Sequence, residues 1–230
     1  MHQPHKSIIM KISLVVCLLF VGTWITKKGH FSATDTPFEA EIKAFETQDQ
    51  QSPPPQNAIV FTGSSSIRHW ENLSTYFPGK PIIQRGFGGS ELSHVLLYAD
   101  RIITPYHPKQ VVIYAGENDI AMGKQTGRQT FDRLVALFTH VRQKLPDATF
   151  TFISIKPSPS RRQYFAENDT ANQLIKDYLA TQANTQFVDI RPIMLSKNGQ
   201  PEPILFKSDS LHMLPAGYER WGRVLSPYLK

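Results

Sequence analysis

The stretch Ala58-Ile-Val-Phe-Thr-Gly-Ser-Ser-Ser-Ile-Arg-His-Trp70 joins a short apolar run to three serines through one glycine. The run at residues 59–62 predicts a buried strand, and the serines just before Ile67 are typical of a helix N-terminus. A sharp turn from strand to helix exposes backbone N–H groups and the positive end of the helix dipole at the carboxyl edge of a sheet. The stretch therefore indicates either a serine nucleophile or a site that binds an anion.

The rest of the chain alternates between strand and helix patterns. Four more short apolar runs predict strands at residues 80–85, 110–115, 149–155 and 186–190. Apolar residues at helical spacing predict helices between these strands and a closing helix at residues 215–229. Strands that alternate with helices predict an α/β fold with one five-stranded parallel sheet and right-handed crossovers.

Polar residues and glycines gather where the predicted strands end. A parallel α/β sheet binds its ligands at the carboxyl ends of its strands. At this edge the sequence places serines 64–66, Gly88 and Gly89, the run Gly116-Glu-Asn-Asp119 and, before the last helix, Asp209-Ser-Leu-His212. Acyl transfer by a serine needs a nucleophile, a base, an acid that orients the base, and donors for the oxyanion. These residues can supply all four.

The four groups of residues resemble the sequence blocks of the SGNH or GDSL-type esterases and lipases. Residues 63–66 resemble the family's Gly-Asp-Ser-Leu block, and Gly89 is similar to the glycine of its second block. Residues 116–119 match the third block, Gly-x-Asn-Asp, in full, and residues 209–212 match the last, Asp-x-x-His. The resemblance covers roughly residues 58–230, and four blocks in order are far more specific than one. It implies a flavodoxin-like three-layer α/β/α sandwich, the SGNH hydrolase fold, and hydrolysis of carboxylic esters.

The same resemblance implies a role for each residue. Ser65 would be the nucleophile, with Ser66 as second choice, His212 the base and Asp209 its partner. The backbone N–H groups of Ser65 and Gly89 and the side-chain amide of Asn118 would form the oxyanion hole. No metal and no cofactor is expected in this reaction.

One residue departs from the family pattern. Ser64 stands where the family usually has aspartate. That aspartate is not a member of the catalytic triad. We therefore expect altered local hydrogen bonding at Ser64 and retained activity.

Each block also has an ordinary structural explanation. The serines can cap a helix, the glycines can form a turn, and Asn118 and Asp119 can cap the next segment. Asp209 and His212 can be a surface pair. A second function is therefore an exported module that binds an anion or a sugar at this edge without hydrolysis. The intact Asp209 and His212 pair favours the esterase, because a binding module does not require it.

Two further arginines and four histidines lie outside these blocks. Arg161 and Arg162 follow a run rich in proline and serine. They could line the mouth of the pocket, but solvated loop charges are the preferred interpretation. The other histidines of the predicted domain are not expected to bring an imidazole next to Ser65: His69, His94, His107 and His140.

Charge and cysteine content exclude several classes of function. The chain has 230 residues and a formal net charge of +6. Four of its 25 basic residues lie in the first thirty positions, which contain no acid, so the rest is nearly balanced. The basic character therefore does not predict nucleic-acid binding. The single cysteine, Cys17, lies in the same leader, so the folded domain can form neither a disulfide nor a cysteine-based metal site.

The first residues have the layout of an export signal. Residues 12–26 are almost entirely apolar and are flanked by Lys11 and Lys27. This run is short for a transmembrane helix, and no clean cleavage site follows it. We therefore expect residues 1–33 to be a signal peptide or an uncleaved N-terminal membrane anchor, and the protein to be periplasmic or secreted. The alternative, a buried N-terminal helix, is opposed by the flanking lysines.

A short connection joins the leader to the predicted domain. Residues 34–56 are expected to contain one amphipathic helix at 37–45 and an extended spacer at 48–56, with three consecutive prolines at 53–55. The hydrolase domain is expected at residues 57–230. Its predicted substrate is a small-molecule or carbohydrate ester, and no nucleic acid is expected as a partner.

Overall fold

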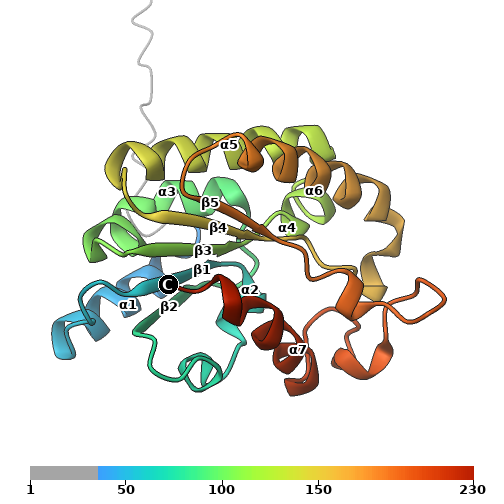
Figure 1. Ribbon diagram of the computed structural model, residues 1–230, viewed down its shortest axis with the longest axis horizontal. Coiled ribbons are helices and arrows are strands. Elements are labelled where there is room, and N and C mark those ends of the chain that lie inside the picture. The colour runs from blue at the N-terminus through green and yellow to red at the C-terminus, as the bar shows by residue number, and fades with distance from the viewer. Residues whose placement is uncertain (1–35) are drawn as a thin grey trace, which may run out of the picture.

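The computed structural model describes residues 36–230, so the predicted leader lies outside the described residues. Five strands form one parallel sheet in the order β2-β1-β3-β4-β5 (Figure 1). The strands are β1 (Ile59–Gly63), β2 (Ile82–Gly86), β3 (Gln110–Tyr114), β4 (Thr149–Ile153) and β5 (Thr185–Val188). This strand order is that of flavodoxin-like doubly wound sheets. The predicted fold is confirmed.

Helices cover both faces of the sheet (Figure 1). One face carries α3 (Leu92–Ile102), α5 (Gly127–Lys144) and α6 (Phe165–Ala180), and the other carries α2 (Ser65–Arg68) and α7 (Pro215–Leu225). The side chains of β3 alternate between these layers, since Val111 and Ile113 join the first core whereas Val112 and Tyr114 join the second. This period of two is what a strand buried on both faces requires.

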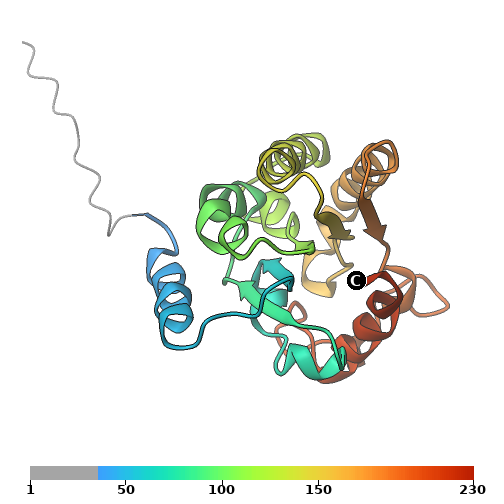
Figure 2. The ribbon, with the colours of Figure 1, turned by 60° about the vertical axis from the view of Figure 1, so that its left-hand side comes forward.

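The predicted short helix is longer than expected and packs on the domain. Helix α1 (Glu39–Gln51) lies beside β2 and α3 (Figure 2). It includes residues 48–51, which were expected in the spacer, because glutamine and aspartate continue a helix until the prolines at 53–55 prevent it. Ile42 is fully buried in the core that includes α3 and α5.

Three neighbouring strands end side by side. Gly63, the last residue of β1, lies opposite Gly86 of β2 and Tyr114 of β3. The segments that carry Ser65, Gly89 and Asn118 therefore leave the sheet at one edge. This edge includes the gap between β1 and β3 where the strand order reverses, which is the place where such sheets bind ligands.

Within residues 36–230, no helix combines the length and the apolar character that a membrane crossing would need.

Candidate active site

Gly63 sets the turn that presents the serines. Its φ is 123°, and a Cβ at this position would lie 1.9 Å from the carbonyl oxygen of Tyr114. Only glycine fits this close approach in this conformation. The chain then turns at Ser64, whose N–H donates to the same carbonyl oxygen at 2.9 Å, and α2 begins at Ser65.

The structure distinguishes Ser65 from its neighbours. The Oγ atom of Ser65 lies 3.0 Å from Nε2 of His212. Ser64 and Ser66 are buried, at 4% and 2% exposure, and neither makes this contact. The residue preferred from the sequence as the nucleophile is therefore the one that the fold brings to the imidazole.

Helix α2 is fixed to the helix that follows His212. Trp70, just beyond α2, stacks on Tyr218 of α7 with ring centroids 5.1 Å apart. The Tyr218 hydroxyl also donates to the carbonyl oxygen of Ser66 at 2.9 Å. These contacts keep the segment of Ser65 and the segment of His212 in a fixed relation.

The spacing of the Asp-x-x-His block is explained by a tight turn. One carboxylate oxygen of Asp209 accepts hydrogen bonds from the N–H groups of Leu211 and His212, both at 2.9 Å. The other lies 2.6 Å from Nδ1 of the His212 ring. Ser210 lies between them with a φ of 55°, in the left-handed region. The carboxylate thus holds both the backbone turn and the ring.

The environment of Asp209 keeps it ionised. Burial raises its pKa, but the hydrogen bonds from the His212 ring and from the Leu211 and His212 N–H groups outweigh burial and lower the pKa to about 2. A carboxylate next to Nδ1 favours the tautomer that carries its proton on Nδ1. Nε2 is then free to accept the proton of the Ser65 hydroxyl.

Asn118 lies in a short helix that the sequence did not predict, α4 (Glu117–Ala121). Its side chain is almost fully buried, at 6% exposure. Nδ2 donates to the carbonyl oxygen of Ser90 at 3.0 Å, and Oδ1 accepts from Nη1 of Arg161 at 2.9 Å. An amide nitrogen carries two hydrogens, so a second donor remains on Nδ2 after the bond to Ser90.

Of the two glycines that follow β2, Gly89 adopts a left-handed turn conformation. Gly89 has a φ of 75°, which favours glycine although a Cβ would meet no atom within 4 Å. The N–H of Gly88 donates to Glu41 of α1 at 3.3 Å. Gly89 makes no hydrogen bond with Ser65 or His212 within residues 36–230, so its place near them follows from the shared strand edge.

Asp119 holds elements together. It is fully buried, and it accepts hydrogen bonds from the N–H of Leu92 at 3.0 Å and from Nη1 of Arg133 at 2.8 Å. Burial raises its pKa, and the bonds from Arg133 and Leu92 oppose the rise. The last residue of the Gly-x-Asn-Asp block therefore ties α4 to α3 and α5.

The sequence model of the GDSL-like lipase/acylhydrolase family matches residues 51–220. The chain belongs to this family. The family assignment made from the sequence is confirmed, and the protein is a hydrolase that acts on ester bonds. Among curated proteins, none matches the chain.

Solved structures share the fold of this GDSL hydrolase. A Streptococcus pneumonia protein, provisionally described as a platelet activating factor, is 21% identical with a TM-score of 0.74, covering 84% of this chain and 92% of its own. A GDSL-like lipase from Bacteroides thetaiotaomicron is 21% identical with a TM-score of 0.67, covering 82% and 97%. A family 3 carbohydrate esterase from Clostridium thermocellum is 16% identical with a TM-score of 0.59, covering 75% and 94%.

Two residues of the GDSL hydrolase that were not among the expected catalytic and oxyanion-hole residues contact them. The ring of His69 packs edge-on against the ring of His212, with centroids 4.9 Å apart. Its pKa is lowered by burial and by the nearby His212, Lys207 and Arg68. The sequence contained one indication of this contact. His69 comes one helical turn after Ser65, which places both residues on the same side of α2.

The second such residue is Arg161, which was expected to be a solvated loop charge. That expectation is wrong, because Nη1 of Arg161 is bonded to Asn118. No local pattern could have indicated this bond, since Arg161 follows β4 and Asn118 follows β3.

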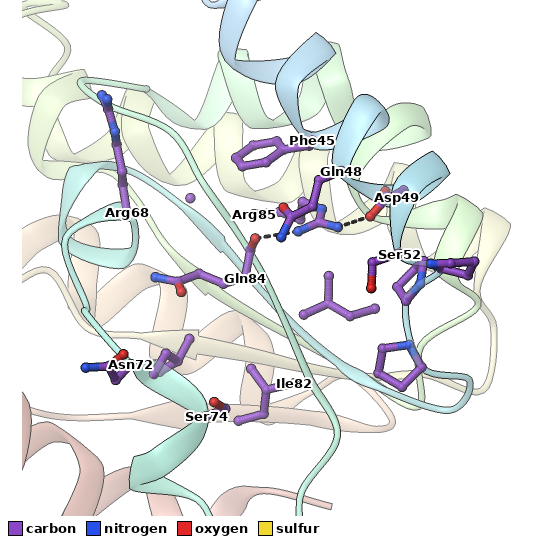
Figure 3. A pocket seen from close by; sticks show the side chains of 16 residues that line it. Phe45, Gln48, Asp49, Ser52, Arg68, Asn72, Ser74, Ile82, Gln84 and Arg85 are labelled. Atoms are coloured by element: carbon purple, nitrogen blue, oxygen red, sulfur yellow. Dashed lines mark hydrogen bonds and ion pairs between the residues drawn. The ribbon is translucent and has the colours of Figure 1, made fainter.

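A cavity of about 570 Å³ lies elsewhere, between α1, the prolines after it and β2 (Figure 3). At one end, Arg85 pairs with Asp49 and lies between the rings of Phe45 and Tyr106, each centroid 5.1 Å from its guanidinium carbon. Neither the histidine nor the serine of the candidate site lines this cavity. It belongs to the packing of α1 against the edge of the sheet.

Proposed function

We propose that this hydrolase is an exported serine esterase in which Ser65 is the nucleophile, His212 the general base and Asp209 its partner. The observation that carries the proposal is the continuous chain from Ser65 Oγ to His212 Nε2, at 3.0 Å, and from His212 Nδ1 to Asp209, at 2.6 Å. The order nucleophile, base and acid is the one that serine acyl transfer uses. A purely binding site has no need of it.

The reaction follows from these positions. His212 Nε2 takes the proton of Ser65 as Oγ attacks the ester carbon, and Asp209 stabilises the imidazolium that forms. The N–H groups of Ser65 and Gly89 and the second Nδ2 hydrogen of Asn118 bind the oxyanion. His212 then gives its proton to the leaving alcohol. Water attacks the acyl-serine by the same route, and the acid is released.

The substrate that we propose is an ester of a small acyl group, including one linked to a carbohydrate. The side chains of His212 and Asp209 are 25% and 46% exposed, so the candidate site is open to solvent. An open site leaves room for a bulky alcohol outside the protein, whereas a long acyl chain needs an apolar cover. The carbohydrate esterase of the same fold is consistent with this class.

Export is proposed from the leader alone. The apolar run between lysines in the first thirty residues has the layout of an export signal. Fractionation of cells that produce the full chain, followed by blotting of the soluble and membrane fractions, tests export and anchoring separately. Recovery of the protein in the cytoplasm would contradict both.

Activity and labelling together test the esterase. The wild-type protein should release p-nitrophenol from p-nitrophenyl acetate and acetate from an acetylated polysaccharide, and a fluorophosphonate should label it on Ser65. The Ser65→Ala variant should show neither release nor labelling. Tight binding of the acetylated polysaccharide without acetate release or labelling would instead support the binding module.

A further inference from the structure

The segment after β4 connects the two halves of the candidate site. Ser160 donates to the carbonyl oxygen of Ser210 from its N–H at 3.1 Å and from its Oγ at 3.0 Å, and Ser210 lies in the turn between Asp209 and His212. The next residue, Arg161, donates from Nη1 to Oδ1 of Asn118. The backbone of Arg161 is therefore anchored to the acid–base turn while its side chain reaches the oxyanion amide.

The bond from Arg161 fixes which way the Asn118 amide points. A guanidinium only donates hydrogen bonds, so it requires the oxygen of Asn118 on its own side. Nη1 also donates to the carbonyl oxygen of Glu117 at 3.0 Å, which holds the guanidinium against α4. A flipped amide would set N–H against N–H at Arg161 and oxygen against oxygen at Ser90. The bonds at Oδ1 and at Nδ2 therefore favour the same orientation of the amide, in which one Nδ2 hydrogen remains for the oxyanion.

Arg161 also brings an unneutralised charge close to Asn118. The adjacent carboxylate, Glu117, is buried and already paired with the buried Lys156. Burial raises the pKa of Glu117, but Lys156 and Arg161 outweigh burial and lower it, so the carboxylate is ionised. Within residues 36–230, Arg161 has no carboxylate within ion-pair distance. Its positive charge at Oδ1 polarises the Asn118 amide, which makes the Nδ2 hydrogens stronger donors to the oxyanion.

We propose that Arg161 is a positioning residue that locks Asn118 with its donor toward the oxyanion and places a positive charge behind it. The inference rests on the proposed function, because it assumes that Asn118 binds the oxyanion. An interaction of this kind strengthens in the transition state, where the negative charge forms. Its loss lowers kcat and leaves KM nearly unchanged.

Three variants test the side chain of Arg161 with p-nitrophenyl acetate. Arg161→Met should lower kcat roughly 10- to 100-fold, less than the loss of an oxyanion donor itself, with little change in KM. Arg161→Lys keeps the positive charge and can still donate to Asn118, but it lacks the planar guanidinium, so it should recover part of the rate. Arg162→Met is the matched control, because Arg162 is exposed and its side chain makes no hydrogen bond or ion pair within residues 36–230; its kcat should be unchanged. Unfolding curves confirm that each variant is folded.

A double-mutant cycle tests whether Arg161 acts on the rate through Asn118 or independently of it. Arg161→Met should have little effect in an Asn118→Ala protein, because the residue that it positions is gone. Effects that multiply in the double variant, a change confined to KM, or an unchanged kcat would overturn the proposal. If Arg161→Met does not fold, Arg161→Lys decides by the same criteria. If Ser65→Ala or Asn118→Ala keeps full activity, it is the proposed function that fails.

Discussion

Ser65 and Ser66 are adjacent in the chain but differ in what their side chains can reach. Ser65 is half-buried and faces the His212 ring, whereas Ser66 is buried at 2% exposure. We expect Ser65→Ala to reduce kcat to the background rate while the thermal unfolding curve stays that of a folded protein. Ser66→Ala, the matched control, should keep most of the activity, and the reverse result would assign the nucleophile to Ser66.

The pH dependence of the reaction also depends on single residues. With its pKa lowered to about 2, Asp209 stays ionised across the whole working range, so protonation of Asp209 should not limit the rate there. The general base accepts the Ser65 proton only in its neutral form, so the rate should fall as the pH is lowered. Asp209→Asn should lower the rate less than His212→Ala, and EDTA should have no effect. A rate that is flat from pH 5 to 9 and lost in EDTA would contradict the serine mechanism.

At the scale of elements, α1 is part of the domain that carries the site. Its Ile42 is completely buried, and the carboxylates of Glu39 and Glu46 accept hydrogen bonds from the Arg101 guanidinium. Glu41 accepts a hydrogen bond from the Gly88 N–H. Ile42→Ala should lower the free energy of unfolding by about 2–5 kcal/mol, because it empties a fully buried site. Lys43→Ala, on the exposed side of the same helix, should change it by less than about 0.5 kcal/mol. Equal, small effects in urea unfolding would show that α1 does not stabilise the domain.

At the scale of the whole molecule, residues 36–230 contain the sheet, both cores and every group of the proposed site. A chain that begins at residue 34 should therefore keep the kcat of the full chain on p-nitrophenyl acetate. If the proposed export signal at residues 1–33 acts as one, the two chains should differ in where the cell places them. A large loss of kcat in the shorter chain, with an unchanged unfolding curve, would give the leader a role in catalysis.

The sequence by itself determined the features that depend on residues close together in the chain. Strand runs, helical spacing and four short blocks predicted the sheet, its parallel direction, the family, and the candidates Ser65, Asp209 and His212, because each depends on neighbouring residues. Only the tertiary structure decided which residues from distant segments meet: His69 against His212, Arg161 on Asn118, and α1 against the glycine turn. The physical reason is that such contacts depend on strand order and on the packing of helices across the sheet. Neither the strand order nor the packing of the helices can be inferred from the spacing of residues that are close in the chain.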